Sequence, residues 1–186
     1  LGHGTGVHAP GLRLPEARQL LVLHHQLLAH GLAAAAIRET CPGVRVGIAA
    51  TGRLCWPGTD SPADVEAACS ATFATPDSDR AFTYQMVLDP VCFGHYPENC
   101  GPGLRRMTAA LPAEDLAVIH IRPDFIGLNI YNGHAVCAGT GKRPVYVPRP
   151  RGCAVTALKW PVTPLVMNWG VRFLWQRYGR PIYITE

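Results

Sequence analysis

Helical and strand segments alternate along the sequence, and this alternation constrains the fold more than any other feature. A long helix is expected over residues 15–39, because a Pro-Glu pair suits its first turn and apolar residues recur on one face. A strand is expected next, with Val44, Val46 and Ile48 at alternate positions. Strands that alternate with helices usually pair in parallel through right-handed crossovers. The sequence therefore predicts an α/β fold.

Two more helices continue the pattern. Residues 61–73 begin with Ser61 as the N-cap and Asp64 three residues later, the arrangement of a capping box. The last helix is expected over residues 164–178, with Thr163 as its cap and a glycine directly after it. Both helices should pack one face against neighbouring strands.

The remaining segments are two strands and two irregular connections. Strands are expected over residues 124–131 and 181–186. Residues 75–112 read as a long connection with a short helix near 104–110, and residues 143–150 as a small extended excursion. Three parallel strands do not close a barrel, and an open sheet of three would leave unpaired edges. The pattern is therefore that of part of a larger α/β domain.

The composition argues against a membrane protein. The longest apolar stretch is interrupted by His24, His25 and His30, so an amphipathic helix is expected there in place of a membrane span. Residues 1–11 show neither a basic start nor a continuous apolar run, so no signal peptide is visible. Seven cysteines without a C-x-x-C pair indicate reduced thiols. We therefore expect a cytoplasmic protein that does not contact a membrane.

Charge and histidine spacing argue against nucleic acid and metal as ligands. Seventeen basic and thirteen acidic residues give a net charge of +4, and the basic residues are scattered. Nucleic-acid binding usually needs a basic patch, so no such partner is expected. His24, His25 and His30 lie on one helix but not at the i, i+4 spacing that lets two imidazoles bind one metal. No metal site is expected.

Three polar side chains fall at the carboxyl ends of the last two predicted strands. Glu186 ends one strand, and Asn129 and Tyr131 end the other. Asn129 and Tyr131 lie two residues apart, so they share one face of their strand. In a (β/α)₈ barrel the active site lies at this end of the strands. The group suits a carboxylate nucleophile held by hydrogen bonds, and the alternative is that Glu186 is a frayed surface residue.

The segments "PIYITE" and "DFIGLNIY" contain Glu186 and the pair Asn129 and Tyr131. "PIYITE" resembles the nucleophile motif of glycoside hydrolase family 1, the retaining β-glucosidases, and "DFIGLNIY" resembles the strand-six motif of that family. The segments "HAPG", "HHQLLAHG" and "KWPVTP" are similar to family segments in the same order. The resemblance covers nearly the whole chain. It implies a single partial catalytic domain over residues 1–186, about strands five to seven of a TIM barrel with their helices.

The resemblance also implies roles for four residues. Glu186 would be the nucleophile that forms a covalent glycosyl-enzyme intermediate, and Tyr131 would hydrogen-bond its carboxylate and keep it ionised and oriented. Asn129 would line the glycone pocket. Trp160 would be the platform on which the aglycone or the next sugar stacks. Without the family, a buried core aromatic would be the usual interpretation of Trp160.

One departure from the family pattern matters most. Retaining hydrolysis needs a second carboxyl group about 5–5.5 Å from the nucleophile, which acts as acid and then as base. The family carries it in an Asn-Glu-Pro motif after strand four, and no Asn-Glu-Pro occurs here. Asp124, Glu98, Glu114 and Asp115 lie at the wrong end of a strand or in connections. We therefore expect a partial sequence, running from just after that motif to the nucleophile, that is inactive alone.

The expected function is that of a β-glucosidase of carbohydrate metabolism. The resemblance implies hydrolysis of terminal β-D-glucosyl residues of cellobiose or aryl β-glucosides, as in cellulose degradation, by double displacement and without a cofactor. Small β-glycosides or oligosaccharides are then its expected partners, and the sequence does not indicate an oligomeric state. The alternative is a non-catalytic carbohydrate-binding or interaction module that offers exposed aromatic side chains for stacking.

Overall fold

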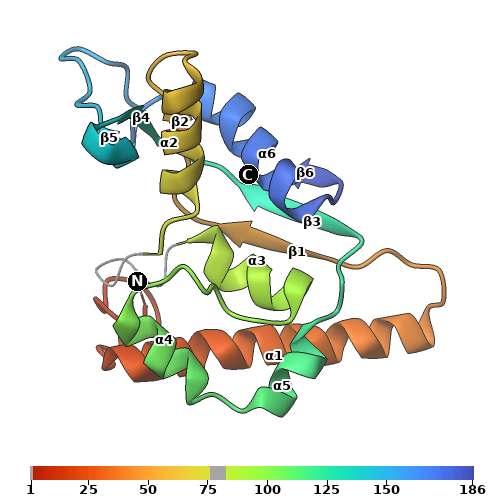
Figure 1. The fold of residues 1–186 in the computed structure, drawn as a ribbon. Coiled ribbons are helices and arrows are strands. Elements are labelled where there is room, and N and C mark those ends of the chain that lie inside the picture. Colours follow the sequence, from red (N-terminus) through yellow and green to blue (C-terminus); the bar gives the residue numbers. More distant parts are fainter. Residues whose placement is uncertain (1, 76–82) are drawn as a thin grey trace. The chain divides into compact units, whose positions relative to one another are not determined.

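The structure, a computed structural model, describes residues 2–75 and 83–186 and divides into two compact units (Figure 1). The unit that we call the helical unit holds residues 2–46, 75 and 85–123. The unit that we call the sheet unit holds residues 47–74, 83–84 and 124–186. The alternation of helices and strands that the sequence predicted is present, so the α/β class is confirmed.

The helical unit is built on one long helix, α1, which contacts two short ones. Its helices are α1 (Glu16–Thr40), α3 (Tyr84–Phe93, from its second residue on), α4 (Pro102–Ala109) and α5 (Ala113–Ile119). The sequence predicted α1 within one residue at each end and α4 within two. It missed α3 and α5, which lie in and just after the segment read as a long connection.

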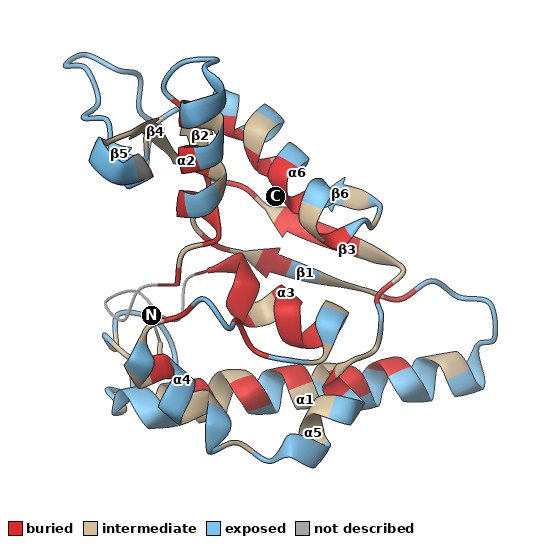
Figure 2. Cartoon of the chain, viewed as in Figure 1, coloured by how far each residue is buried: buried red, intermediate tan, exposed pale blue. Residues whose placement is uncertain are grey.

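One stripe of α1 is buried, and its members follow helical spacing (Figure 2). They are Leu20, His24, Leu27, Gly31 and Ala34. Gly31 permits the close approach of α5, because a Cβ atom there would lie 2.3 Å from the carbonyl oxygen of Val118. One face of the helix is buried, with a histidine and a glycine at its centre. The expected amphipathic pattern is wrong, because apolar side chains such as Leu32 and Ile37 are exposed on the rest of the helix.

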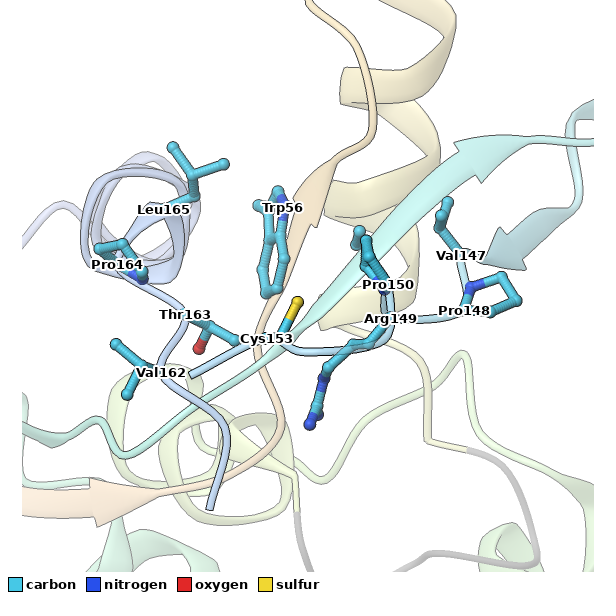
Figure 3. Close-up of a pocket in the computed structure, with 11 residues that line it drawn as sticks. Trp56, Val147, Pro148, Arg149, Pro150, Cys153, Val162, Thr163, Pro164 and Leu165 are labelled. Atoms are coloured by element: carbon cyan, nitrogen blue, oxygen red, sulfur yellow. The ribbon is translucent and has the colours of Figure 1, made fainter. Parts of the chain in front are cut away.

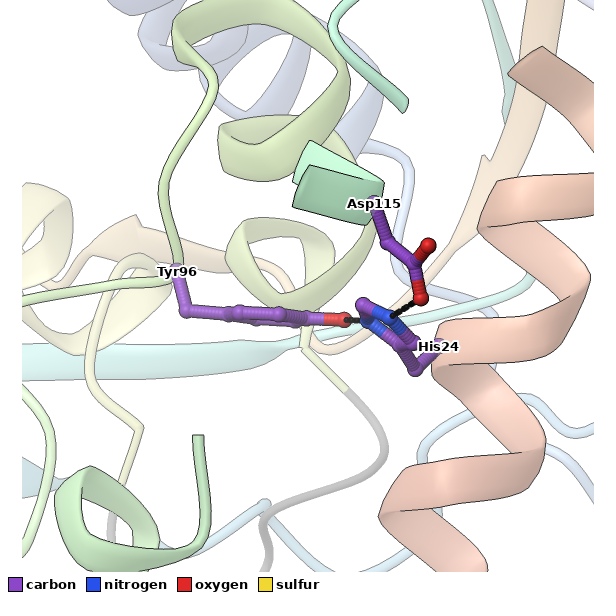
Figure 4. Close-up of polar contacts among 3 residues, drawn as sticks. All are labelled: His24, Tyr96 and Asp115. Atoms are coloured by element: carbon purple, nitrogen blue, oxygen red, sulfur yellow. Dashed lines mark hydrogen bonds and ion pairs between the residues drawn. The ribbon is translucent and has the colours of Figure 1, made fainter. Parts of the chain in front are cut away.

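His24 lies at the centre of a polar cluster with Tyr96, which is buried, and Asp115, which is partly exposed (Figure 4). Its ring is fully buried; Nδ1 lies 2.9 Å from the hydroxyl of Tyr96, and Nε2 lies 3.0 Å from Oδ2 of Asp115. A buried ring nitrogen without a partner would cost free energy of folding, so both contacts stabilise the unit. The sequence treated His24 as a polar interruption, whereas it joins α1 to α5 and to the segment that follows α3.

By length and composition, α1 could cross a membrane, and among the described helices it alone meets that test. The expectation that this stretch is too polar to span therefore does not hold on those two criteria. The buried His24 cluster is typical of a helix packed within a protein, since hydrocarbon would satisfy neither ring nitrogen. The absence of a membrane contact stays a prediction.

The sheet unit contains a parallel sheet with the strand order β1-β3-β6 (Figure 1). Its strands are β1 (Gly47–Thr51), β3 (Phe125–Asn129) and β6 (Ile182–Ile184). Thr51 pairs with Asn129, and Leu128 pairs with Ile184, so the three strands end at nearly the same level. The predicted first strand was placed too early: Val44 and Val46 precede β1, and Val44 is exposed.

A second, smaller sheet has the order β2-β4-β5, and two helices pack on it. Its strands are β2 (Cys55–Pro57), β4 (His134–Ala138) and β5 (Pro144–Tyr146), with α2 (Pro62–Thr72) and α6 (Leu165–Tyr178) beside them and the short turn η1 (Thr140–Lys142) before β5. The sequence located α2, α6 and β5 but not β2 or β4. β2 has only three residues, whereas β4 has five and was missed despite its length.

The predicted Ser61 cap is confirmed, whereas the side chains of Asp64 and Thr163 have partners other than those predicted. The hydroxyl of Ser61 accepts from the backbone N–H of Asp64, as predicted. The Asp64 carboxylate, however, accepts from the backbone N–H and hydroxyl of Thr59 and from the N–H of Ala138, so the reciprocal half of the capping box is wrong. The Thr163 hydroxyl does not cap α6; it accepts from the N–H of Gly133. Both side chains join a helix start to the loops around β4.

Candidate active site at the carboxyl edge of the sheet

The carboxyl ends of β3 and β6 bring the predicted site residues together. Beyond the last paired residues of β6, the backbone continues beside β3: the N–H of Thr185 donates to the carbonyl of Leu128 at 3.0 Å. The N–H of Ile130 donates to the carbonyl of Glu186 at 2.8 Å. These two bonds fix Glu186 opposite the segment that carries Asn129 and Tyr131.

Tyr131 and Glu186 are hydrogen-bonded, with the phenol as donor and Oε2 of the carboxylate as acceptor. This hydrogen bond is the main cause that raises the pKa of Tyr131 above its ordinary value; burial and the charge of Glu186 add to it. The phenol therefore remains a hydrogen-bond donor at neutral pH. Tyr131 is 44% exposed, so a ligand has access to the pair.

Asn129 is held at its backbone and at its side chain. Its carbonyl accepts from the hydroxyl of Tyr84 at 3.0 Å and from that of Thr51 at 3.3 Å. Its side-chain Oδ1 accepts from the hydroxyl of Thr185 at 2.6 Å. Because the oxygen of the amide is engaged, its NH₂ group is left to donate to a ligand.

The sequence did not single out Tyr84, Thr51 or Thr185 as contributors to this site. Tyr84 is fully buried, and burial raises its pKa, so its hydroxyl stays protonated and donates. No motif marks Tyr84, which lies 45 residues before Asn129 in the chain. Thr185 lies inside the quoted "PIYITE" motif, and its distance of one residue from Glu186 was the available signal.

Trp160 lies beside the tyrosine, with its ring centroid 5.2 Å from that of Tyr131. A tight loop holds it: the N–H of Thr156 donates to the Trp160 carbonyl at 2.7 Å, and the Thr156 hydroxyl accepts from the Trp160 N–H at 3.2 Å. Trp160 is 42% exposed, so its interpretation as a core aromatic is wrong. An exposed indole next to Tyr131 can stack on a ring-shaped ligand.

No second carboxylate in the described sheet unit is placed to act with Glu186. Asp124 precedes β3, at the end of the strand opposite to Asn129. The Asp64 carboxylate is engaged by Thr59 and Ala138. Within the described residues no group of three or more His, Cys, Asp or Glu side chains could hold a metal. The arrangement thus brings together one carboxylate, a phenol that donates a hydrogen bond to it, and an exposed aromatic ring.

Comparison with known proteins identifies the family. The family model of glycosyl hydrolase family 1 matches residues 1–186, which is the whole chain. The chain belongs to glycosyl hydrolase family 1. A β-glucosidase of Agrobacterium sp. is 36% identical over an alignment that covers 100% of this chain and 40% of the relative. The chain therefore spans about two fifths of that family-1 enzyme.

Two solved family-1 structures share the fold. The β-glucosidase from Thermotoga maritima in complex with castanospermine matches with a TM-score of 0.71 and 30% identity, over 99% of this chain and 39% of the other. The virulence factor SghA from Agrobacterium tumefaciens matches with a TM-score of 0.72 and 32% identity, over 98% of this chain and 40% of the other. The parallel strands and helices described above are thus part of a family-1 TIM barrel, as the motifs implied.

Proposed function

We propose that this chain supplies the nucleophile half of a retaining β-glucosidase active site. The observation that carries the proposal is the hydrogen bond from Tyr131 to Glu186 at the carboxyl edge of a parallel sheet, in a chain of family 1. We further propose that both units belong to one catalytic domain, since the family match runs through both of them.

The mechanism that follows is a double displacement. Glu186 attacks the anomeric carbon, a C–O bond forms to its carboxylate, and the bond to the leaving oxygen breaks. Tyr131 fixes the rotamer of Glu186, so that the attacking oxygen is the one that the phenol leaves uncovered. Water then cleaves the glycosyl-enzyme and releases the sugar with retained configuration. The leaving oxygen takes its proton from a second carboxyl group, which these residues do not supply.

We propose aryl β-glucosides and cellobiose as substrates, with the glycone near Asn129 and the aglycone against Trp160. The exposed ring of Trp160 beside Tyr131 supports an aglycone that is itself a ring. A relative supports the aryl class: SghA has been solved with its substrate analogue salicin. A role in cellulose degradation and a cytoplasmic location are part of the same proposal, and cell fractionation would test the location.

The decisive test is to trap the covalent intermediate in the protein at the length that its gene encodes. A dinitrophenyl 2-deoxy-2-fluoro-β-glucoside should label the nucleophile, because its leaving group departs without an acid and the fluorine slows the second step. We expect the added mass on the peptide that contains Glu186, and none in Glu186→Gln. A label on a different residue, or hydrolysis without any label, would contradict the proposal.

The isolated 186-residue chain gives a second test. We expect it to release nitrophenol from p-nitrophenyl β-glucoside no faster than buffer, because it has no Asn-Glu-Pro carboxylate. Substantial turnover by this chain would show that another residue acts as the acid. Glucoside binding without labelling or turnover, in the chain and in the full-length protein alike, would favour the non-catalytic binding module instead.

A further inference from the structure

A cavity of about 230 Å³ lies in the sheet unit and shares no lining residue with the Glu186 site (Figure 3). It is formed by β2, by the loop that follows β5 and by the start of α6. Glu186, Tyr131, Asn129 and Trp160 do not line it. Figure 3 shows Trp56 between Leu165 and Pro164 on one side and Pro150 on the other. The proposed hydrolysis gives this cavity no role.

The lining of the cavity suits an aromatic ring better than a sugar. Its walls are the indole of Trp56, three proline rings and aliphatic side chains such as Val162 and Leu165. Planar rings pack well on indole and proline surfaces. A sugar would bring many hydroxyl groups to a surface with few polar partners, and each unpaired group costs free energy of binding.

The size of the cavity limits the ligand to about one substituted ring. A closed apolar cavity of roughly 150 Å³ can hold benzene. This one is larger, at about 230 Å³, and all its lining residues beyond the strands except Thr163 are exposed, so a ligand can enter without unfolding the loop. A single ring with one small substituent therefore fits.

The charge at the cavity decides which substituent is favoured. Arg149 lines it, and no described residue forms an ion pair with that guanidinium. The guanidinium of Arg149 therefore makes this end of the cavity electropositive. Burial lowers the pKa of the neighbouring His134, and the charge of Arg149 lowers it further. A guanidinium binds a carboxylate through two parallel hydrogen bonds.

We propose that this cavity is a binding site for a small aromatic carboxylate, with the ring against Trp56 and the carboxylate on Arg149. A neutral aromatic ligand would use the apolar walls but not the guanidinium. An aromatic amine would meet repulsion from Arg149. The anion therefore matches both the shape and the charge of the site, and the proposal does not depend on hydrolysis by Glu186.

Calorimetric titration of the gene-encoded, full-length protein tests the proposal with simple probes. We expect benzoate to bind in the millimolar range or better, benzyl alcohol more weakly, and benzylammonium and glucose not at this site. Equal affinity for benzoate and benzyl alcohol would overturn the assignment of Arg149. If benzoate does not bind at all, the proposed site is refuted. The same result is expected if another segment of the protein or a second copy fills the cavity, and it refutes the ligand site in that case too.

Variants locate the binding within the fold. Arg149→Gln should weaken benzoate about tenfold, the loss of one charge-assisted contact, and leave benzyl alcohol unchanged. Arg151→Gln is the matched control, because Arg151 is exposed on the same loop but does not line the cavity. Val162→Trp should fill the cavity and abolish binding of both probes. An equal loss in the two arginine variants, or unchanged binding in Val162→Trp, would contradict the site.

Glucoside hydrolysis by the same variants separates this inference from the proposed function. Arg149→Gln should retain the wild-type kcat, since Arg149 is not part of the Glu186 site. Benzoate binding without any hydrolysis would refute the β-glucosidase proposal and leave the aromatic site standing. Hydrolysis without benzoate binding would refute the aromatic site and leave the β-glucosidase proposal standing.

Discussion

Two clusters in this chain connect a tyrosine hydroxyl with a carboxylate, one through a histidine and the other directly, and they differ in how far they are buried. In the helical unit, His24 is fully buried between Tyr96 and Asp115, and both of its ring nitrogens have protein partners. In the sheet unit, Tyr131 donates to Oε2 of Glu186, whose side chain is exposed. The other carboxylate oxygen of Glu186 accepts no hydrogen bond from any described residue. Similar donors and acceptors therefore stabilise a fold where they are saturated and buried, and can do chemistry where they are exposed.

The largest expected effect tests the chemical half of this comparison. Glu186→Gln should reduce kcat for aryl glucoside hydrolysis in the full-length protein by about 10⁴-fold or more, because the amide cannot form the glycosyl ester. Its thermal unfolding should stay close to wild type, since the side chain is exposed. Steady-state kinetics measure kcat, and a melting curve measures the unfolding temperature. If the variant loses activity only because it unfolds, Glu186 has a structural role like that of His24, and the contrast between the two clusters is wrong.

His24→Ala tests the structural half. It leaves Asp115 and Tyr96 without their shared partner and opens space in the core, so we expect a loss of about 2–4 kcal/mol in the free energy of unfolding. His25→Ala is the matched control, because His25 is the next residue but is exposed, and it should change stability by less than about 0.5 kcal/mol. Denaturant unfolding measures both. Equal losses would show that His24 contributes no more than a surface position.

Tyr131→Phe removes the donor and keeps the ring. We expect kcat to fall about 10- to 100-fold, since one positioned hydrogen bond to the nucleophile is lost, with little change in unfolding. The contact between the rings of Tyr131 and Trp160 should persist, so KM for aryl glucosides should change less than kcat. A change confined to KM would place Tyr131 in substrate binding instead of in the orientation of Glu186.

Thr185 sharpens the comparison, because it acts on the site through Asn129. Thr185→Val preserves the shape but removes the hydroxyl that engages Oδ1, so the Asn129 amide can rotate. We expect a decrease in kcat of about three- to tenfold. Thr185→Ser keeps the hydroxyl and should restore most of the activity. If both variants behave alike, the packing of the methyl group, and not the hydrogen bond, is what matters.

The smallest effect is a titration. The raised pKa of Tyr131 means that its hydrogen bond is fully present below the ordinary tyrosine pKa of about 10 and is lost as the pH rises through the raised value. The difference in ultraviolet absorbance between wild type and Tyr131→Phe should therefore show tyrosinate forming above that ordinary value. Glu186→Gln should shift the pH at which Tyr131 ionises back toward the ordinary value. An unchanged ionisation pH in this variant would show that Glu186 does not raise the pKa of Tyr131.

The sequence predicted what depends on local pattern and family motifs. Periodicity and caps located α1, α2 and α6, and the motifs placed Asn129, Tyr131 and Glu186 at neighbouring strand ends. It missed elements that depend on tertiary context. β2 has three residues and exists because it pairs with β4, and α3 continues through Pro90, a residue that normally ends a helix.

The misread polar residues have a common physical reason. His24 and Asp64 each have local sequence surroundings that suggest an exposed side chain, yet both are buried against partners far along the chain. Sequence spacing cannot reveal a partner 91 or 74 residues away. The same limit hid Tyr84, whose hydroxyl reaches the Asn129 carbonyl from 45 residues before it.

The hydrogen bond between the Ile130 N–H and the Glu186 carbonyl has a consequence for how the segment can vary. Side chains on a strand alternate between faces, so deleting one residue between Gly179 and Glu186 would turn the carboxylate away from Tyr131. The loop over residues 147–153 lies outside any strand, and its length is not tied to that register. Insertions and deletions should therefore be tolerated in that loop and be fatal to hydrolysis in the short stretch before Glu186.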